Sequence, residues 1–380
     1  MNLPFREIPM SQLHDLYELG QSIWYDFISR DFISSGKMQE LVEHGIRGMT
    51  SNPTIFEGAI AGGSAYDSQI ARLDEQGMAT AEIATELFMT DVRDACDVIR
   101  PVFNQSNGLD GYISLEVSPT LAHDTSGTVE EAHRLWKGVE RPNLMIKIPA
   151  TPEGYSAIRS CIADGINVNV TLIFSLDQYR QVVEAYLAGL EDRLSAEKTI
   201  DHIHSVASVF VSRIDSMIDN ILTTIGSIEA TGLRGKAGLA NSKLVYQEFH
   251  RLFSGERWEQ LAAHGAHPQR PLWASTSTKD PSYPDLLYVE NLIGAQTVNT
   301  VPPPTLDAIL DHGKARLSIE EGIDGAELIL QQLEEVGVSL AQVMDDLLKE
   351  GVEKFQASFT SLFDKIESKR SQLREVDLSK

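Results

Sequence analysis

The chain has 380 residues, of which 42% are hydrophobic, enough to bury the core of one large α/β domain or of two smaller ones. It carries 32 Lys and Arg residues against 55 Asp and Glu residues, and the resulting net charge of -23 repels nucleic acid and anionic membrane surfaces. We therefore expect neither nucleic acid nor a membrane as a partner.

The two cysteines, Cys96 and Cys161, lack the paired CxxC spacing of a disulfide frame, a redox motif or a zinc site. The first residues, "MNLPFREIPMSQLHDL", have no basic stretch followed by an apolar core. No segment reaches the ~18 uninterrupted apolar residues that a membrane-spanning helix needs. These features predict a cytoplasmic protein.

Short runs rich in β-branched and apolar residues recur, each followed by a stretch with helical period, which is typical of βαβ units around a parallel sheet. There are eight such runs, at residues 22–28, 45–52, 111–118, 143–150, 166–174, 205–214, 271–277 and 295–303. Eight strands allow a closed barrel, so we predict an α/β fold, a (β/α)8 TIM barrel with additional helices. A doubly wound open sheet is the alternative.

Two long intervals, 53–110 and 215–269, contain amphipathic patterns that predict extra helices rather than linkers. From about residue 305 nearly all of the sequence has a helical period, which we interpret as the last barrel helix and an extension packed on the outside. No linker, charge block or fixed repeat divides the chain. We therefore expect residues 1–380 to form a single barrel domain with an N-terminal helix and a C-terminal helical extension.

Capping residues indicate where several helices begin and end. Thr151 followed by Pro152 opens one helix, and Gly165 would end it. Two further pairs have the spacing of a capping box: Ser175 with Gln178, and Thr128 with Glu131.

Polar residues gather at or near the ends of the predicted strands, where a barrel builds its active site. They are Asp26, Asn52, Glu116, Lys147, Asn167, Asn169, Thr171, Ser208, Arg213, Ser275, Ser277 and, just beyond, Lys279. Interior positions of barrels are usually branched and apolar, so this many polar groups indicates a site rather than packing alone. The three from the fifth strand share one face because side chains alternate with a period of two.

Lys147 lies between Ile146 and Ile148 in a strand that is otherwise apolar. Burying a charged amine is costly unless it is paired, so Lys147 either forms a structural ion pair with Glu116 or Asp26 or has a chemical role. Desolvation favours the neutral amine, which attacks carbonyl groups to form a Schiff base. Glu116 and Asp26 would then carry the proton transfers, directly or through water.

Amide and hydroxyl side chains among these residues suit a ligand with many hydroxyl groups. Asn52, Asn169 and Thr171 have groups that donate and accept hydrogen bonds, as sugar hydroxyls require. Each is a weak signal alone, since "SNP" is also a good turn and "NVNVT" also fits an ordinary edge strand.

Cations follow the sixth and seventh predicted strands, where barrels often hold a phosphate group. Arg213 in "FVSRID", with Ser275 and Lys279 in "WASTSTK", predicts a phosphate pocket there. The alternative for Arg213 is an ion pair with Asp215 or a role in capping a helix.

Signals for metal and dinucleotide binding are poor. His202 and His204 share one face of a strand start, but without a third ligand we interpret them as exposed polar histidines. "GLRGKAG" spaces its glycines as GxxGxxG without a preceding strand, which is the wrong pattern for a dinucleotide fingerprint. We expect no metal and no cofactor.

Five motifs taken together resemble the transaldolase family, in particular its longer bacterial form. They are "GMTSNPTIFEGAI", "NLMIKIPAT", "INVNVTLIFSLDQY", "SVFVSRID" and "LWASTSTKDPSYPDLLYVENLIGAQTVNTVPPPTLDA". The resemblance runs from about residue 20 to 315 and implies a (β/α)8 barrel of the non-oxidative pentose phosphate pathway. It implies a transferase that moves a dihydroxyacetone unit from sedoheptulose 7-phosphate to glyceraldehyde 3-phosphate, giving erythrose 4-phosphate and fructose 6-phosphate.

The same resemblance assigns roles to residues. It places the family's Schiff-base lysine on Lys147, its acid–base glutamate on Glu116 and its strand-one aspartate on Asp26. The substrate-binding positions fall on Asn52, Asn169, Thr171, Ser208, Arg213 and Ser275. Many family members have an arginine where this chain has Ser277, so Lys279 is our candidate for the second phosphate-binding cation.

Two other functions remain open. A Schiff-base aldolase of the same superfamily would release free dihydroxyacetone, although such relatives are much shorter and lack the glutamate that Glu116 represents. A barrel that acts only as a binding or scaffold protein would have no reason to keep Lys147 among buried polar groups. The sequence fits either a monomer or a homodimer.

Overall fold

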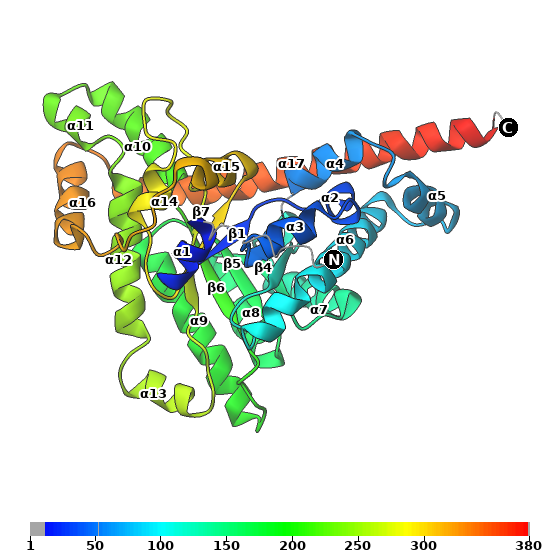
Figure 1. The fold of residues 1–380 in the computed structure, drawn as a ribbon, viewed down its shortest axis with the longest axis horizontal. Helices are drawn as coiled ribbons and strands as arrows, with labels where there is room; N and C mark the ends of the chain where they lie inside the picture. The colour runs from blue at the N-terminus through cyan, green and yellow to red at the C-terminus, as the bar shows by residue number, and fades with distance from the viewer. Residues whose placement is uncertain (1–11, 52, 379–380) are drawn as a thin grey trace, which may run out of the picture.

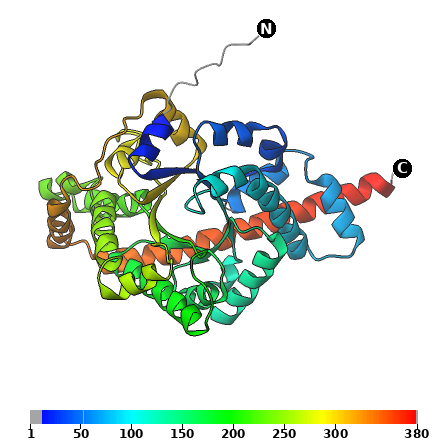
Figure 2. The ribbon, with the colours of Figure 1, turned by 60° about the horizontal axis from the view of Figure 1, so that its bottom comes forward.

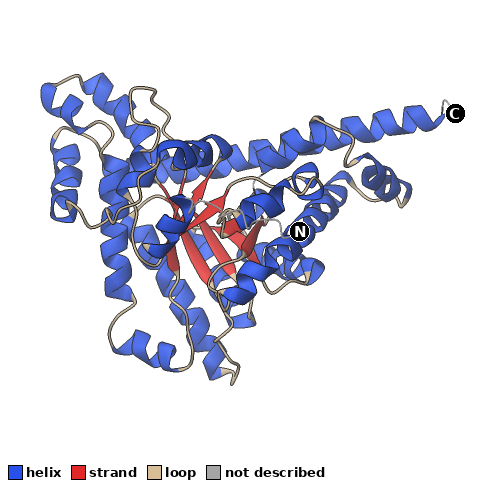
Figure 3. Ribbon diagram, in the orientation of Figure 1, coloured by secondary structure: helices blue, strands red, loops and turns tan. Residues whose placement is uncertain are grey.

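Eight parallel strands form a closed barrel in chain order, and β1 pairs with β8 to complete it (Figures 1 and 3). The structure, a computed structural model, describes residues 12–51 and 53–378. The strands are β1 (Gln21–Tyr25), β2 (Gly48–Met49), β3 (Tyr112–Glu116), β4 (Leu144–Pro149), β5 (Val168–Ile173), β6 (Ser205–Phe210), β7 (Arg270–Ala274) and β8 (Thr297–Val301). The (β/α)8 prediction is confirmed, and the doubly wound open sheet is excluded.

Each of the eight predicted runs overlaps one strand, but the strands are shorter than the runs, and β1 and β7 begin one residue before theirs. The sixth run was expected to continue to residue 214, whereas β6 ends at Phe210 and a helix begins at Ser212. Residues beyond the carboxyl end of a barrel strand leave the ladder to form the loops that surround the active site. The extra predicted length therefore falls mainly in the site-forming loops.

Helices surround the barrel as a ring (Figure 2). Between β1 and β6 they are α2 (Arg30–Ser34), α3 (Lys37–Glu43), α4 (Pro53–Ala61), α5 (Asp67–Glu75), α6 (Thr80–Gln105), η1 (Pro119–Leu121), α7 (Thr125–Val139), α8 (Pro152–Asp164) and α9 (Leu176–Ser195). The others are α1 (Gln12–Glu18), α10 (Ser212–Ile225), α11 (Ile228–Leu233), α12 (Ala237–Leu252), α13 (Glu256–Ala263), α14 (Leu287–Asn291), α15 (Pro303–His312), η2 (Ile323–Gly325), α16 (Ala326–Glu335) and α17 (Leu340–Leu378). The extra helices expected in both long intervals are present, and no helix within the described residues is long and apolar enough to cross a membrane.

Three of the four predicted helix caps are confirmed. The Thr151 side chain accepts a hydrogen bond from the Gly154 amide at the start of α8, and Gly165 ends that helix in the left-handed conformation, with φ +93°. Ser175 and Gln178 form the capping box of α9, each side chain accepting from the other's backbone amide.

The capping box predicted for Thr128 and Glu131 is wrong. Helix α7 begins earlier, because the Asp124 side chain accepts from the Gly127 amide and caps it. Thr128 is buried inside the helix and donates to the Leu121 carbonyl, while Glu131 accepts from the Ser118 amide. Asp is as good an N-cap residue as Thr, and here it lies one turn upstream.

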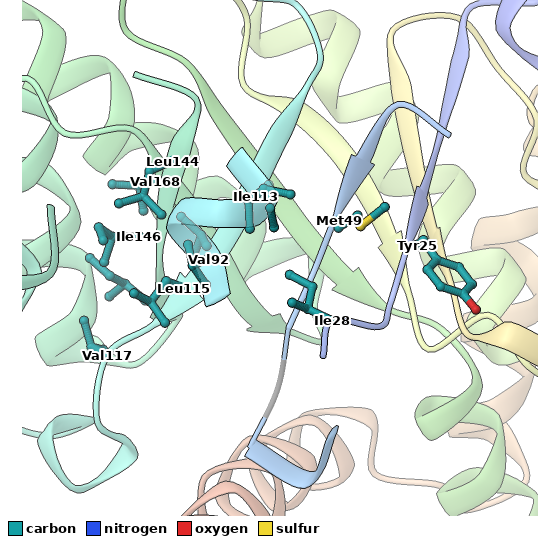
Figure 4. Packing of buried hydrophobic residues seen from close by; sticks show 14 of the residues in the cluster. Tyr25, Ile28, Met49, Val92, Ile113, Leu115, Val117, Leu144, Ile146 and Val168 are labelled. Atoms are coloured by element: carbon teal, nitrogen blue, oxygen red, sulfur yellow. The ribbon is translucent and has the colours of Figure 1, made fainter. Parts of the chain in front are cut away.

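The strands place alternate side chains inside the barrel and against the helices. Figure 4 shows Ile113 and Leu115 of β3 and Leu144 and Ile146 of β4 packed in one cluster with Val92 of α6. A second cluster contains the alternate residues of the strands that face the barrel interior, Trp24, Tyr112, Met145, Val206, Leu272 and Val298 among them. Apolar side chains thus fill the amino-terminal half of the barrel and leave its carboxyl end to polar residues.

The C-terminal extension covers an end of the barrel, which the sequence did not indicate. Helix α17 passes across the ring of helices in Figure 2, and it contacts α10 and β5, then η1, and then α4, α5 and α6. The predicted helical extension is present, but it lies over the carboxyl end rather than only against the outer wall.

Candidate active site

A cavity of about 230 Å³ opens at the carboxyl end of the barrel. Seven predicted site residues line it: Asp26, Lys147, Thr171, Ser208, Arg213, Ser275 and Lys279. It is also lined by Thr50, Phe210, Ala274, Ser277, Thr300, Pro302 and Phe355. The structure therefore brings residues of β1, β4, β5, β6, β7 and the following loops to one place, as the barrel rule requires.

Lys147 points into this cavity because it alternates with Ile146 and Ile148, which pack outward in the helix-facing cluster. Its side chain is only 9% exposed, and its Nζ lies 3.8 Å from Oε1 of Glu116. At this distance the two groups form an ion pair, but they are too far apart for a hydrogen bond. The predicted structural ion pair exists, and it leaves the amine facing the cavity.

Glu116 lies on β3 directly beside Lys147 in the strand register, and it is buried. Within the described part of the chain, neither of its carboxylate oxygens has a hydrogen-bond partner. Burial raises the pKa of Glu116 and the charge of Asp26 raises it further, while Lys147 and Arg213 act in the opposite direction. A carboxyl group in this state is suited to exchange a proton with a group bound at Lys147.

Asp26 follows β1 and is held by a threonine that sequence reasoning missed. Thr50 donates its hydroxyl to Oδ1 of Asp26 at 2.6 Å, and the Thr50 and Thr300 hydroxyls are 2.8 Å apart. Thr50 belongs to the "TSN" motif after the second strand, from which only Asn52 was predicted as a site residue. Asn52 itself lies outside the residues that the structure describes.

Asn169 does not line the cavity but lies just beneath it. Ser208 donates to its Oδ1 at 2.7 Å, and its Nδ2 donates to the Ser114 hydroxyl at 2.9 Å. Ser114 was missed, although it precedes Glu116 by two residues and therefore shares its face. Thr171 does line the cavity, and its hydroxyl has no hydrogen-bond partner among the described residues.

Asn167 was expected to point the same way as Asn169, but it lies before the start of β5 and serves the backbone there. Its Nδ2 donates to the Pro142 and Leu144 carbonyls, and its Oδ1 accepts from the His204 amide. Asn167 therefore ties neighbouring strands together at the amino-terminal end.

The cationic side of the cavity is formed by Arg213 and Lys279. Arg213 lies in the first turn of α10, and its buried Nη1 has no hydrogen-bond partner among the residues described. Burial lowers the pKa of Arg213, which Glu350 and Glu116 oppose. The alternative ion pair with Asp215 is wrong, because the Asp215 carboxylate accepts from the Gly238 amide and the Tyr288 hydroxyl.

Lys279 and the serines face Arg213 from the loop after β7. The Lys279 amine donates to the Ser277 hydroxyl at 2.5 Å, and the Ser275 and Ser212 hydroxyls are 2.9 Å apart. Lys279 is exposed overall but also lines the cavity, and burial and then the charge of Arg213 lower its pKa. Two cations and hydroxyl groups around one space suit an anionic oxygen-rich group such as phosphate.

A larger hollow of about 520 Å³ lies at the opposite end of the barrel. His204 lines it and stacks on His267 at 4.2 Å, and burial lowers the pKa of His204 to about 3. His204 is thus a buried neutral residue, not the exposed one expected. Arg270, at the same end, is held by Asp110 and Ser22. Barrel enzymes carry out their chemistry at the carboxyl end of the strands, so this hollow is not where the active site is expected.

An amine inside a barrel mouth, with two carboxyl groups nearby and cations opposite, defines a barrel enzyme that can bind a carbonyl substrate covalently. The sequence profile of the transaldolase/fructose-6-phosphate aldolase family matches residues 23–366. The chain belongs to this family.

Curated relatives extend the similarity over nearly the whole chain. It is 49% identical to a transaldolase of Parafrankia sp. (strain EAN1pec) over 356 residues, 93% of this chain and 96% of the relative. It is also 49% identical to a transaldolase of Thermobifida fusca (strain YX) over 358 residues, 94% of this chain and 97% of the relative. With a transaldolase of Trichodesmium erythraeum (strain IMS101) the identity is 46% over 379 residues, 96% of this chain and 99% of the relative.

Proposed function

We propose that the protein is a transaldolase, a transferase that uses Lys147 as a Schiff-base nucleophile. It takes a dihydroxyacetone unit from sedoheptulose 7-phosphate and transfers it to glyceraldehyde 3-phosphate, giving erythrose 4-phosphate and fructose 6-phosphate. The observation that carries the proposal is the Lys147 amine, which faces the cavity 3.8 Å from Glu116. Relatives named transaldolase that match nearly the full chain support the same reaction.

The reaction begins when the neutral Lys147 amine attacks the ketose carbonyl carbon. Glu116, acting through a water molecule, gives a proton to the hydroxyl that leaves, and an imine forms. The cationic imine withdraws electrons as the C3–C4 bond breaks, and Asp26 takes the proton of the C4 hydroxyl. The aldose product departs while the dihydroxyacetone unit stays bound to Lys147.

The second half runs these steps in reverse with a new aldose. The bound three-carbon unit attacks the aldehyde carbon of the acceptor, Asp26 returns the proton to the new hydroxyl, and water hydrolyses the imine with Glu116 as the acid–base group. Since one product leaves before the second substrate binds, the kinetics are expected to be ping-pong.

Substrate binding is divided between the two sides of the cavity. Arg213, Lys279 and Ser275 bind the phosphate group, supported by the unpartnered Nη1 of Arg213 and by the position of α10, whose N-terminal turn contains that residue. Thr171 and Ser208 bind hydroxyl groups of the sugar, as does Asn52. Asn169 contributes by holding Ser208, to whose hydroxyl it is hydrogen-bonded.

The experiment is to incubate the protein with fructose 6-phosphate, reduce it with borohydride and map the added mass by peptide mass spectrometry. A three-carbon adduct on the Lys147 peptide that is missing in Lys147→Ala is the expected result. A folded wild-type protein with no adduct from fructose 6-phosphate or sedoheptulose 7-phosphate would refute the proposal and favour a binding protein. Adding erythrose 4-phosphate then separates a transferase from an aldolase, because only the transferase converts the bound unit efficiently into sedoheptulose 7-phosphate.

We also propose that residues 1–380 form one domain and that the enzyme acts in the cytoplasm as a monomer or homodimer on phosphorylated sugars, without nucleic acid or membrane partners. The contacts of α17 with α4, α5, α6 and α10 support the single domain. One cooperative unfolding transition, followed by tryptophan fluorescence and circular dichroism, is expected, and two separate transitions would contradict it. Sedimentation at micromolar concentration decides the oligomeric state.

A further inference from the structure

Helix α17 approaches the barrel closely at a glycine. A Cβ atom placed on Gly351 would lie 2.9 Å from Cδ2 of Leu172, so a larger residue there would need something to shift. Leu172 has φ +60° and lies in the irregular part of β5, immediately after Thr171. Gly351 therefore allows the helix to lie directly against the strand that lines the cavity.

One helical turn later, α17 contributes a side chain to the cavity. The ring of Phe355 lines it, with Nζ of Lys147 5.7 Å from the ring centroid. The next residue fixes this part of the helix, because Gln356 donates through Nε2 to the Pro119 carbonyl at 3.2 Å. The Phe355 ring thus lies beside the Lys147 amine in the cavity, while Phe210, the other aromatic residue in the lining, has its ring centroid 5.0 Å from the Arg213 guanidinium carbon.

We propose that Phe355 determines whether the three-carbon unit on Lys147 is transferred or released. This inference rests on the proposed function. Release requires that the carbon nucleophile takes a proton, that water adds to the imine carbon and that the C–N bond breaks, giving dihydroxyacetone and the free amine. Transfer instead forms a C–C bond to an aldehyde. By limiting the access of bulk water, the proton source for the carbon nucleophile, the ring suppresses release, while the single water that acts with Glu116 keeps its place.

The test compares two rates of the purified full-length protein with fructose 6-phosphate as donor. One is the release of free dihydroxyacetone without an acceptor, and the other is the formation of sedoheptulose 7-phosphate with erythrose 4-phosphate. In Phe355→Ala the ratio of release to transfer should rise by about 10-fold or more, while borohydride still traps an adduct on Lys147. Phe355→Leu, which keeps part of the bulk of the ring, should lie between the wild type and Phe355→Ala.

Matched variants separate this effect from a general effect on the helix. Phe363 also lies on α17 and is also partly buried, but its ring packs on Phe359 at 5.8 Å, away from the cavity. Phe363→Ala and Phe363→Leu should keep the wild-type ratio. Gly351→Ala, which displaces the helix from Leu172 without touching Phe355, should raise the ratio in the same direction by a smaller factor.

The outcomes are distinguishable. An unchanged ratio in the Phe355 variants, with normal transfer by the wild type, overturns the role of Phe355 and leaves the transaldolase proposal intact. A wild type that forms no adduct overturns both. If circular dichroism shows that Phe355→Ala does not fold, Phe355→Leu and Gly351→Ala decide, and a wild-type ratio in both overturns the inference.

Discussion

Burial gives the Glu116 carboxyl group a property that an exposed glutamate lacks. Because its pKa is raised, its protonated form persists to higher pH, where it can still give a proton to the hydroxyl that leaves during imine formation. The rate of imine formation should fall as pH rises through this raised pKa. Glu116→Gln should lose that limb of the pH profile and be slower by about 10²- to 10⁴-fold, measured by timed trapping with cyanoborohydride.

The control for this variant is Glu130→Gln, since Glu130 is exposed on α7 and does not line the cavity. It should keep the wild-type rate and profile. A Glu116→Gln protein with wild-type rate at every pH would exclude Glu116 from proton transfer and leave it a structural partner of Lys147.

Nη1 of Arg213 has no hydrogen-bond partner among the described residues, so we expect Arg213 to favour phosphorylated over unphosphorylated substrates. Arg213→Met should lower kcat/KM for glyceraldehyde 3-phosphate by about 10- to 150-fold for each charged hydrogen bond lost, worth about 1.5–3 kcal/mol. Lys279→Met should cost less, because Lys279 is exposed and already donates to Ser277. Unphosphorylated glyceraldehyde is the control acceptor, and an equal loss with both acceptors would show that these cations do not bind phosphate.

Helix α10 is joined to its neighbours by a buried carboxyl group. Oδ1 of Asp215 accepts from the Gly238 amide of α12, Oδ2 accepts from the Tyr288 hydroxyl of α14, and burial raises the pKa of Asp215 to about 6. A raised folded-state pKa contributes stability below the unfolded value near 3.8 that is lost as pH rises through about 6.

Asp215→Asn keeps the shape and removes the titration. The free energy of unfolding of the wild type relative to this variant should therefore decrease by up to about 3 kcal/mol between pH 4 and pH 7, measured by urea unfolding. The same difference at both pH values would show that Asp215 does not titrate in this range.

The capping box of α9 makes a simpler prediction. Ser175→Ala removes the side-chain oxygen that accepts from the Gln178 amide at 3.1 Å, so it should lower the free energy of unfolding by about 1 kcal/mol. Ser160→Ala, in the exposed middle of α8, is the matched control and should change it by less than about 0.5 kcal/mol. Equal effects of the two variants would show that the cap adds nothing.

The sequence could predict the features that depend on residues close together along the chain. The Ser175 cap and the Gly165 helix end depend on residues within one turn, and the inward position of Lys147 depends on strand alternation. The Thr128 prediction failed where two good capping residues, Asp124 and Thr128, competed within one turn. The sequence also did not predict that Asn169 lies beneath the cavity, because its side chain is held there by Ser114 and Ser208, which belong to other strands.

Phe355 shows a further reason why prediction from sequence stopped short. Its place in the amphipathic pattern of α17 indicates that one face of the helix is buried, but not which surface buries it. That choice depends on Gly351 fitting Leu172 and on ion pairs at the far end of the helix, all between segments distant in sequence. A resemblance to known proteins assigns the residues of the strands, whereas the cover over them comes only from the assembled molecule.

Helix α17 is held across the molecule at its far end by Asp74 of α5. Arg370 donates to Oδ1 of Asp74 through Nη2 at 2.5 Å, and Arg374 donates to Oδ2 through Nε at 2.6 Å. The hydrogen bonds from Arg374, and then those from Arg370, lower the pKa of Asp74 to about 2 against the opposing effect of burial. A depressed folded-state pKa contributes stability above the unfolded value near 3.8 that is lost as pH falls towards about 2.

Asp74→Asn should therefore lower the free energy of unfolding by about 1 kcal/mol at pH 7 and by less at pH 3. The effect at pH 7 is smaller than the pKa shift alone implies, because solvent screens the arginines. Hydrogen exchange at pH 7 should be faster in residues 366–375 but unchanged around Phe355, because Gly351 against Leu172 and Gln356 at Pro119 hold that part locally. The ratio of dihydroxyacetone release to transfer should then equal that of the wild type. Faster exchange along the whole of α17, with more release, would instead show that the helix covers the cavity only while both of its ends are anchored.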